Sequence, residues 1–325
     1  MISKTMKKLI SIFLTLTVFV SALPGCSSSN ENKKLSVVTT IFPEYDWVMQ
    51  ILGNENDNIN VSLLLNSGVD LHSFQPSADD IIKISSADLF IYVGGTSDDW
   101  IQDALKEAKN KNMITINLFE VLEDRVKEEE LVEGMEEEEE EDDSSDVEYD
   151  EHVWLSLENA SRACTAIKDA LIKLDPSNSS IYALNTENYI SKLHDLDSKY
   201  QETVNKAKRN TIVFGDRFPF RYLVDDYGMK YYAAFLGCSS ESEASFDTVI
   251  FLANKVDELQ IPVVFTMENP NHTIAETIIK NTKAKSAKVL VLDSMQSTTS
   301  KDIKNGVSYL SIMEKNLDTL RIALN

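Results

Sequence analysis

Glycine is scarce in this sequence, and the glycine-rich motifs that bind nucleotide phosphates are missing. Only ten glycines occur among 325 residues, and none of them stands in a G-x-G-x-x-G or G-x-x-x-x-G-K-[ST] arrangement. Those two loops are the commonest cradles for nucleotide phosphates. The sequence also has no G-x-S-x-G, H-E-x-x-H or C-x-x-C motif. The commonest signatures of nucleotide-binding proteins and hydrolases are therefore absent.

Positive charge is also in short supply. The chain has 31 Lys and Arg against 53 Asp and Glu, which gives a formal net charge of −22. Such a chain repels phosphate backbones, so we expect no nucleic-acid partner. By sign alone, cations are the natural ligands. With 43% hydrophobic residues, the chain can bury one large or two ordinary hydrophobic cores.

The amino terminus is typical of an export signal. Three lysines precede the largely apolar run Leu9–Leu23, which is shorter than the roughly 20 residues of a membrane span. The segment that ends at Cys26 resembles the bacterial lipoprotein box, although Pro24 replaces the usual small residue. We therefore predict a signal peptide over residues 1–25, a lipid on Cys26 and a polar tether over residues 26–34. The alternative is a secretory peptide that leaves Cys26 as a free thiol.

The rest of the chain alternates apolar runs with helical spacing, which predicts an α/β fold with parallel sheets. We predict two Rossmann-like lobes, over residues 35–176 and 210–325. The long amphipathic stretch 177–209 contains no Gly or Pro and predicts one rigid helix that joins them. The strands are predicted at Leu35–Thr40, Ile59–Leu65, Ala87–Val93, Met113–Asn117, Thr211–Phe214, Met229–Phe235, Pro262–Thr266 and Lys288–Leu292.

One segment fits neither lobe. Residues 128–151 contain sixteen Asp and Glu and no Lys or Arg. Like charges at that density do not pack together, so we expect a solvated insertion. It could be a solubilising loop or a weak collector of divalent cations beside a binding cleft.

A few side chains that can bind metal follow the predicted strands. His72 follows the second strand, and His152 ends the acidic segment. Asp216, Glu268 and Asp293 follow strands of the second lobe. Ligands bind at the carboxyl ends of parallel strands, so two imidazoles from one lobe and carboxylates from the other could surround one metal ion. The two other histidines, His194 and His272, fit surface or capping roles.

Four segments in sequence order resemble the bacterial metal-binding lipoproteins that supply zinc or manganese to ABC importers (cluster A-I, zinc-uptake type). GVDLHSFQPSADDIIKISSADLFIYVGG (68–95) is similar to their first signature, and YDEHVWLSLENA (149–160) to their second. YGMKYYAAF and VLVLDSM match the later landmarks. The resemblance covers residues 35–325 and implies the same fold of two lobes and one long helix.

The resemblance implies that His72, His152 and Asp293 are metal ligands. At the family's third ligand position, where zinc members have His and manganese members have Glu, this chain has Arg217. A guanidinium has no lone pair to offer, so another donor must replace it. We predict Asp216 at this place. The alternatives are a water molecule or a residue from a neighbouring loop, namely Glu268, Glu241, Glu243 or Cys238.

The function implied by the resemblance is a monomeric, lipid-anchored, extracytoplasmic solute-binding protein. It would capture Zn²⁺, or alternatively Mn²⁺, and deliver it to an ABC permease with its ATPase, without catalysing a reaction. The alternatives are a surface adhesin and an exported metallohydrolase, whose open metal site would activate water. Apart from Cys26, the only thiols are Cys164 and Cys238, and the sequence leaves open whether they form a disulfide.

Overall fold

The computed structural model describes residues 34–54, 57–135, 148–239, 243–269 and 271–325. The predicted signal peptide, the lipidation site Cys26, most of the tether and the centre of the acidic segment lie outside these ranges. Residues from Lys34 to Asn325 form one compact unit. None of the helices in the described ranges is long and apolar enough to cross a membrane.

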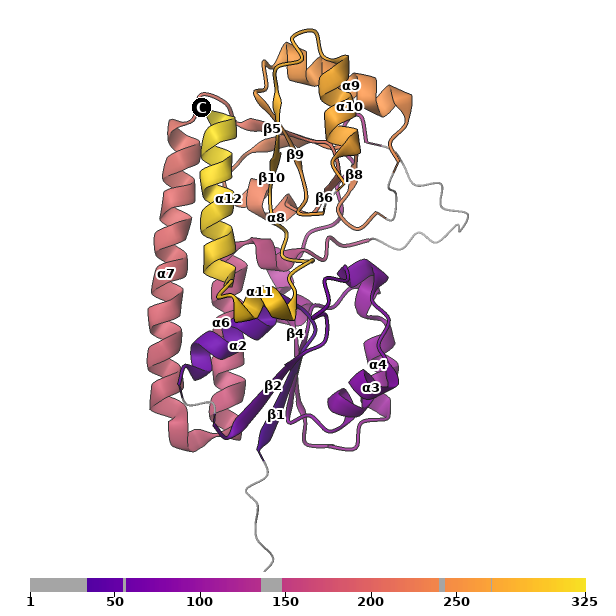
Figure 1. Ribbon diagram of the computed structural model, residues 1–325. Helices are drawn as coiled ribbons and strands as arrows, with labels where there is room; N and C mark the ends of the chain where they lie inside the picture. Colours follow the sequence, from indigo (N-terminus) through magenta and orange to yellow (C-terminus); the bar gives the residue numbers. More distant parts are fainter. Residues whose placement is uncertain (1–33, 55–56, 136–147, 240–242, 270) are drawn as a thin grey trace, which may run out of the picture. The chain divides into compact units, whose positions relative to one another are not determined.

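The amino-terminal half is built on a parallel four-stranded sheet in the order β2-β1-β3-β4 (Figure 1). The strands are β1 (Leu35–Thr39), β2 (Ile59–Leu63), β3 (Leu89–Tyr92) and β4 (Ile114–Asn117). The helices are α2 (Phe42–Leu52), α3 (Ala78–Ser85), α4 (Trp100–Lys106), α5 (Leu118–Leu122) and α6 (Leu157–Leu174). Short 3-10 turns lie between them: η1 (Leu71–Ser73), η2 (Thr96–Asp98), η3 (Glu123–Arg125) and η4 (Val153–Leu155).

The carboxy-terminal half repeats the plan with a parallel sheet in the order β10-β9-β5-β7. Its strands are β5 (Thr211–Phe214), β7 (Lys230–Tyr232), β9 (Val263–Thr266) and β10 (Lys288–Val291). Its helices are α8 (Arg221–Asp226), α9 (Phe246–Glu258), α10 (Thr273–Asn281), α11 (Ser300–Lys304) and α12 (Tyr309–Leu324). A second small sheet pairs β6 (Arg217–Phe218) with β8 (Phe235–Leu236). All eight predicted strands are confirmed, whereas this small sheet was not predicted.

The predicted long helix is α7 (Ser179–Lys206), which follows the turn η5 (Pro176–Asn178). Its 28 residues extend about 42 Å at 1.5 Å per residue. One stripe of the helix is buried, at spacings of four and three residues: Tyr182, Thr186, Tyr189, Leu193, Leu196 and Tyr200. This stripe packs against α2, α6 and α12, so α7 runs beside elements of both halves (Figure 1). The helix α7 therefore contacts both halves along its length.

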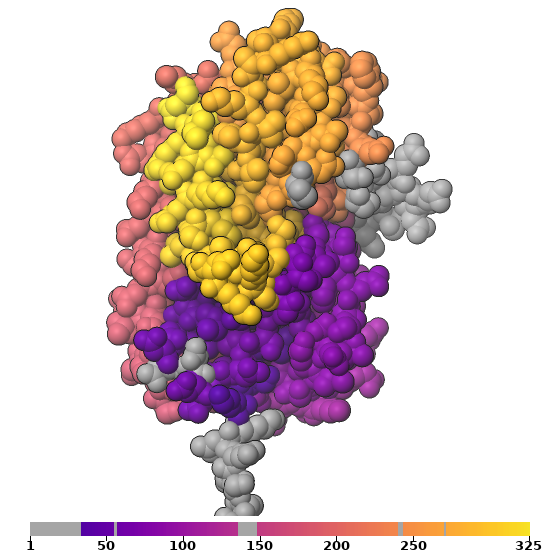
Figure 2. All heavy atoms as spheres, in the orientation of Figure 1, coloured from indigo at the N-terminus to yellow at the C-terminus, as the bar shows by residue number. Residues whose placement is uncertain are grey.

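The carboxy-terminal segment returns to the amino-terminal half, which the predicted division at residue 210 did not anticipate. Thr299 forms an antiparallel bridge with Ser67, and α12 packs against α2. The phenol of Tyr309 donates to the carbonyl of Trp154 at 2.7 Å. Figure 2 shows α11, in yellow, lying directly against the indigo amino-terminal half. One hydrophobic core therefore continues from β1 to α12.

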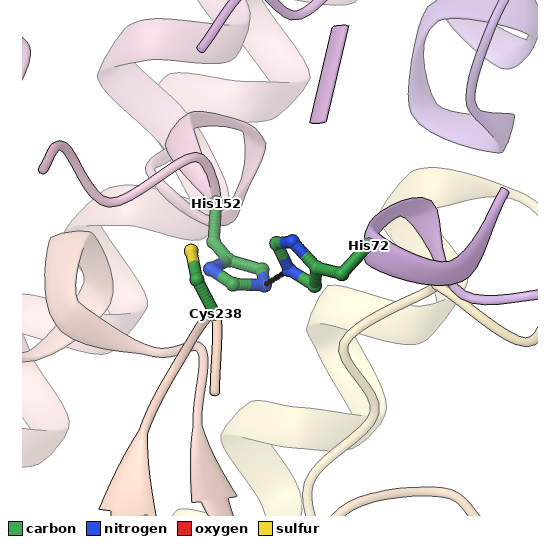
Figure 3. Close-up of side chains that lie close together, drawn as sticks. All are labelled: His72, His152 and Cys238. Atoms are coloured by element: carbon green, nitrogen blue, oxygen red, sulfur yellow. Dashed lines mark hydrogen bonds between the residues drawn. The ribbon is translucent and has the colours of Figure 1, made fainter. Parts of the chain in front are cut away.

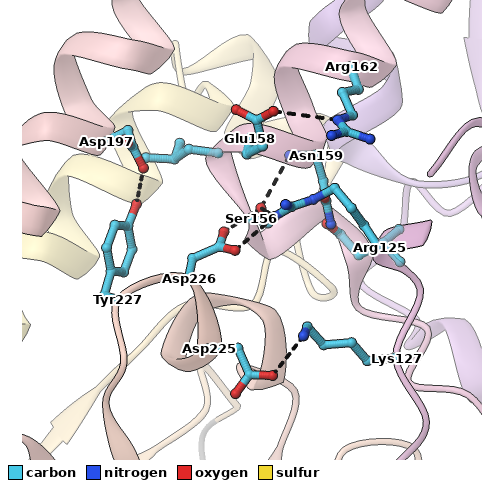
Figure 4. A network of polar contacts seen from close by, with 12 residues as sticks. Arg125, Lys127, Ser156, Glu158, Asn159, Arg162, Asp197, Asp225, Asp226 and Tyr227 are labelled. Atoms are coloured by element: carbon cyan, nitrogen blue, oxygen red, sulfur yellow. Dashed lines mark hydrogen bonds and ion pairs between the residues drawn. The ribbon is translucent and has the colours of Figure 1, made fainter. Parts of the chain in front are cut away.

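A polar network also joins the halves (Figure 4). Arg125 reaches from η3 to Asp226 of α8, with 2.8 Å between Nη2 and Oδ1. Asp226 also accepts from the hydroxyl of Ser156. Lys127 pairs with Asp225 at 3.1 Å. Because core packing and ion pairs both cross the boundary, the halves are braced against large hinge motions.

Candidate metal centre

His72 lies in the turn η1 that follows β2, and Asp70 fixes the start of this turn. Asp70 Oδ1 accepts from the backbone N–H of His72 at 3.0 Å, as an N-cap side chain does. The ring Nδ1 of His72 lies 2.9 Å from Ser97 Oγ and 3.4 Å from Glu151 Oε2. Glu151 itself accepts from the backbone N–H of Ser97 at 2.8 Å. The Nδ1 side of the His72 ring is thus held by acceptors.

His152 immediately precedes η4 and is completely buried. Asp150 Oδ1 accepts from the backbone N–H of His152 at 2.8 Å and lies 3.0 Å from the ring Nδ1. With the proton on Nδ1, both histidines donate it to these acceptors, which leaves the lone pair on Nε2. Asp150 therefore orients the His152 ring so that its Nε2 atom can donate an electron pair, and Glu151 lies beside His72 in the same way.

The two imidazoles meet through their Nε2 atoms, which lie 3.2 Å apart (Figure 3). Two donors on a tetrahedral zinc ion, each at about 2.0–2.1 Å, are about 3.3 Å from one another. The spacing of the pair therefore fits a zinc ion bound by both rings. The prediction that loops far apart in sequence bring His72 and His152 together agrees with this geometry.

A third donor atom joins the pair from the other half. The ligand atoms of His72, His152 and Cys238 all lie within 4.8 Å of one another (Figure 3). Cys238 follows β8, and Gly237 allows this strand to come close to His152. A Cβ at Gly237 would lie 2.9 Å from the carbonyl oxygen of Phe218 and 3.2 Å from His152 Nδ1. Cys238 and Cys164 are both free thiols, so no disulfide competes for this sulfur.

Three carboxylates, those of Glu129, Asp150 and Glu151, lie around the centre and give it a negative potential. Burial and the charge of Asp150 raise the pKa of Glu129 to about 7. Burial also raises the pKa of the Cys238 thiol, with further contributions from Asp150, Glu129 and Glu151. Burial of the His152 ring is the largest single effect and opposes its charged form, but the charge and hydrogen bond of Asp150 and the charges of Glu129 and Asp70 together raise the pKa of His152. The same negative potential attracts a divalent cation.

This geometry corrects the prediction that the whole acidic segment is solvated. Asp150 and Glu151 are both 0% exposed. The two ends of the segment pair with each other through a bridge between Glu128 and Tyr149, and the backbone N–H of Asp150 donates to the carbonyl of Lys127 at 2.9 Å. Asp150 and Glu151 are therefore part of the centre, because they contact His152 and His72.

Arg217, at the third ligand position that the resemblance implies, connects the two halves. Its Nη2 lies 2.6 Å from Asp70 Oδ2, and its Nη1 donates to the carbonyl of Ser239 at 3.2 Å. The guanidinium thus connects the turn of His72 to the loop of Cys238. Beside it is a cleft of about 350 Å³, lined on one side by Asp70 and His72 and on the other by Arg217 and Asn269.

The two predicted carboxylate ligands do not belong to the group of three that the described residues form. Asp216 Oδ2 accepts from Thr266 Oγ1 at 2.8 Å and from Asn269 Nδ2 at 3.1 Å, which holds the loop after β9. Asp293 Oδ1 accepts from the backbone N–H of Met295 at 2.9 Å. Burial and the charge of Glu268 raise the pKa of Asp293 to about 6.

The remaining predicted donors are not part of the group that the described residues form around the histidines. Glu241 lies outside the described residues, and neither Glu243 nor Glu268 belongs to the group around the histidines. Glu268 instead accepts from the backbone N–H of Ser294 at 2.9 Å. His194 is exposed on α7, and His272 precedes α10 at its N-cap position. The acceptors Asp150 and Glu151 were missed, although their positions directly before His152 could have suggested them.

Comparisons with known proteins identify relatives described as zinc-binding or zinc-uptake proteins. The model of the family ZnuA, described as "Zinc-uptake complex component A periplasmic", matches residues 37–323. The zinc-binding lipoprotein AdcA of Streptococcus pneumoniae strain R6 is 32% identical over 97% of this chain and 61% of its own length. The chain thus spans less than two thirds of that relative.

Two further comparisons extend over nearly the full length of both partners. The high-affinity zinc uptake system protein ZnuA of Bacillus subtilis is 32% identical over 92% of this chain and 90% of its own length. A crystal structure of the Zn(II)-bound ZnuA-like domain of Streptococcus pneumoniae AdcA superposes with a TM-score of 0.69 and 31% identity. It covers 90% of this chain and 99% of its own.

Proposed function

This chain belongs to the family of zinc-uptake complex component A, and on that premise we propose that it captures Zn²⁺ in its cleft and delivers the ion to an ABC permease. The observation that carries the proposal is the pair of imidazole Nε2 atoms 3.2 Å apart. Each ring has its other nitrogen held by a hydrogen-bond acceptor, which sets both rings in the orientation that metal ligation needs.

The ion is bound by the Nε2 atoms of His72 and His152. Imidazole suits zinc better than the hard cations Mg²⁺ and Ca²⁺, and manganese is the alternative cargo that prefers more oxygen donors. Asp293 and Asp216 stay predicted carboxylate donors of the other half. The surrounding carboxylates Glu129, Asp150 and Glu151 draw the cation in and offset its charge once it is buried.

We assign the protein to the extracytoplasmic face of the cell membrane. Cys26 would carry the lipid that anchors it, and residues 27–34 would separate the folded unit from the bilayer. Its partners are an ABC permease with its ATPase, and it acts as a monomer. The family is a transport family, so no catalysis is proposed. Adhesion to another surface stays an alternative prediction that transport does not exclude.

Zinc titration of the full-length protein in detergent tests the proposal. The unsubstituted protein should bind one zinc ion tightly, and the double variant His72→Ala, His152→Ala should lose this binding. The matched control is His194→Ala, His272→Ala, which removes two imidazoles that are not among the residues lining the cleft and should bind zinc as before. Circular dichroism checks that each variant is folded. Equal zinc affinity in both double variants would reject the proposed site.

A further inference from the structure

We propose that the Cys238 thiolate is the third protein donor of the zinc site and that it makes the site select zinc over manganese. This inference rests on the proposed function and extends it to the ligand set. The sequence-based prediction favoured Asp216 at this position and kept Cys238 among the alternatives.

The position of Cys238 is built by its own strand and loop. β8 pairs with β6 and leads through Gly237 to the cysteine, which comes within 4.8 Å of the ligand atoms of both histidines. The backbone N–H of Cys238 donates to Glu129 Oε1 at 3.1 Å, and the neighbouring carbonyl of Ser239 accepts from Arg217. The backbone at Cys238 and Ser239 is therefore fixed beside the two histidines.

Two rivals for the third position, Arg217 and Asp216, have other partners. Arg217 cannot ligate a cation, and its guanidinium faces Asp70 and the carbonyl of Ser239. Asp216 accepts three hydrogen bonds at one oxygen, from Thr266, Met267 and Asn269. Within the described ranges, Cys238 is the one residue of this half in the group that could hold a metal ion. A chain that has Arg217 at the third ligand position implied by the resemblance thus has a different donor within reach.

A thiolate changes which metal the site prefers. On binding, the S–H bond breaks, the proton passes to solvent, and the sulfur lone pair forms a Zn–S bond. Soft thiolates bind zinc strongly, whereas manganese prefers carboxylate, carbonyl and water oxygens. A site with two imidazoles and one thiolate therefore discriminates against manganese more than a site with two imidazoles and a carboxylate. Ligation would also join the two halves directly through the ion.

X-ray absorption at the zinc edge tests the donor without any substitution. With one equivalent of zinc on the full-length protein, we expect a sulfur shell at about 2.3 Å beside nitrogen or oxygen donors at about 2.0–2.2 Å. The variant Cys238→Ser should lose the sulfur shell, and its zinc affinity should fall by about tenfold or more, as for loss of a group that tunes a metal site. The matched control Cys164→Ala removes a buried thiol of α6 and should leave both unchanged.

Competition between metals tests the selectivity. The variant Cys238→Asp offers an oxygen donor, so the ratio of manganese to zinc dissociation constants should shrink by about tenfold or more relative to the unsubstituted protein. A shell of nitrogen and oxygen alone around tightly bound zinc would overturn the inference and leave the proposed function standing. An unchanged metal ratio in Cys238→Asp would overturn the selectivity. Absence of tight zinc binding in the unsubstituted protein would reject both proposals.

Discussion

Replacing Arg217 by Gln should weaken zinc binding although residue 217 donates no electron pair to the ion. The guanidinium connects the turn of His72, through Asp70, to the loop of Cys238, through the carbonyl of Ser239. Without this clamp, zinc itself must order both loops as it binds. The free energy of ordering is then taken from the binding free energy.

The size of the effect follows from the burial of the ion pair. The side chains of Arg217 and Asp70 are only 18% and 22% exposed. Fully exposed pairs contribute about 0–1 kcal/mol, and hydrogen bonds to charged groups about 1.5–3 kcal/mol. We therefore expect a loss of about 1–2 kcal/mol, which corresponds to a rise in the zinc dissociation constant of about 5- to 30-fold.

The assay is competition for zinc with a chromophoric chelator, and the matched control is Arg221→Gln. Arg221 is 17% exposed and pairs with Glu130 and Asp225, so the control removes the same charge at similar burial. It should leave the affinity within about twofold, because its partners do not hold the turn of His72. Equal affinities for the two variants and the unsubstituted protein would refute the role of the clamp.

Three further predictions concern groups around the centre and in the core. Asp150→Asn weakens the acceptor of His152 and should lower zinc affinity by about 10- to 100-fold in the same competition assay; an unchanged affinity would show that the ring is oriented without it. Burial raises the pKa of Glu44 to about 8. The protonated side chain therefore stabilises the folded state fully below the unfolded pKa of about 4.3, and this stabilisation is lost as the pH rises through the folded pKa. The melting temperature should therefore fall between about pH 5 and 8, and less so in Glu44→Gln; equal slopes would contradict the assignment. Tyr309→Phe leaves the buried carbonyl of Trp154 without this donor and should cost about 1–3 kcal/mol in chemical denaturation, whereas an unchanged midpoint would mean that the bond contributes nothing.

Most of the fold could be predicted from the short apolar segments, because parallel strands are short, apolar and bounded by polar turns. Leu35–Thr39 and Lys288–Val291 lie within the segments predicted for them. The small sheet of β6 and β8 has two residues in each strand, which is too short for any periodicity. The return of α12 to the amino-terminal half depends on contacts such as that of Tyr309 with Trp154, which no local pattern encodes.

Site residues could be predicted where their position in the sequence pattern indicates their role. They could not be predicted where contacts with residues distant in sequence decide that role. His72 was predicted from its place after a strand and His152 from its place at the end of the acidic segment and in the second family signature, and the two rings lie together in the structure. Asp150 and Glu151 were predicted to be solvated, because the local composition shows only the repulsion between neighbouring acidic residues. It does not show the histidines beside which both carboxylates are buried. Cys238 was one of several open alternatives, because its approach requires Gly237 and the pairing of β8, which appear only in three dimensions.

The most direct test of zinc capture by the imidazole pair is a crystal structure of the zinc-loaded protein with anomalous data at the zinc edge. We expect one strong anomalous peak between His72 and His152, at about 2.0–2.1 Å from each Nε2 atom. A peak bound elsewhere, with the two Nε2 atoms free of metal, would contradict the account.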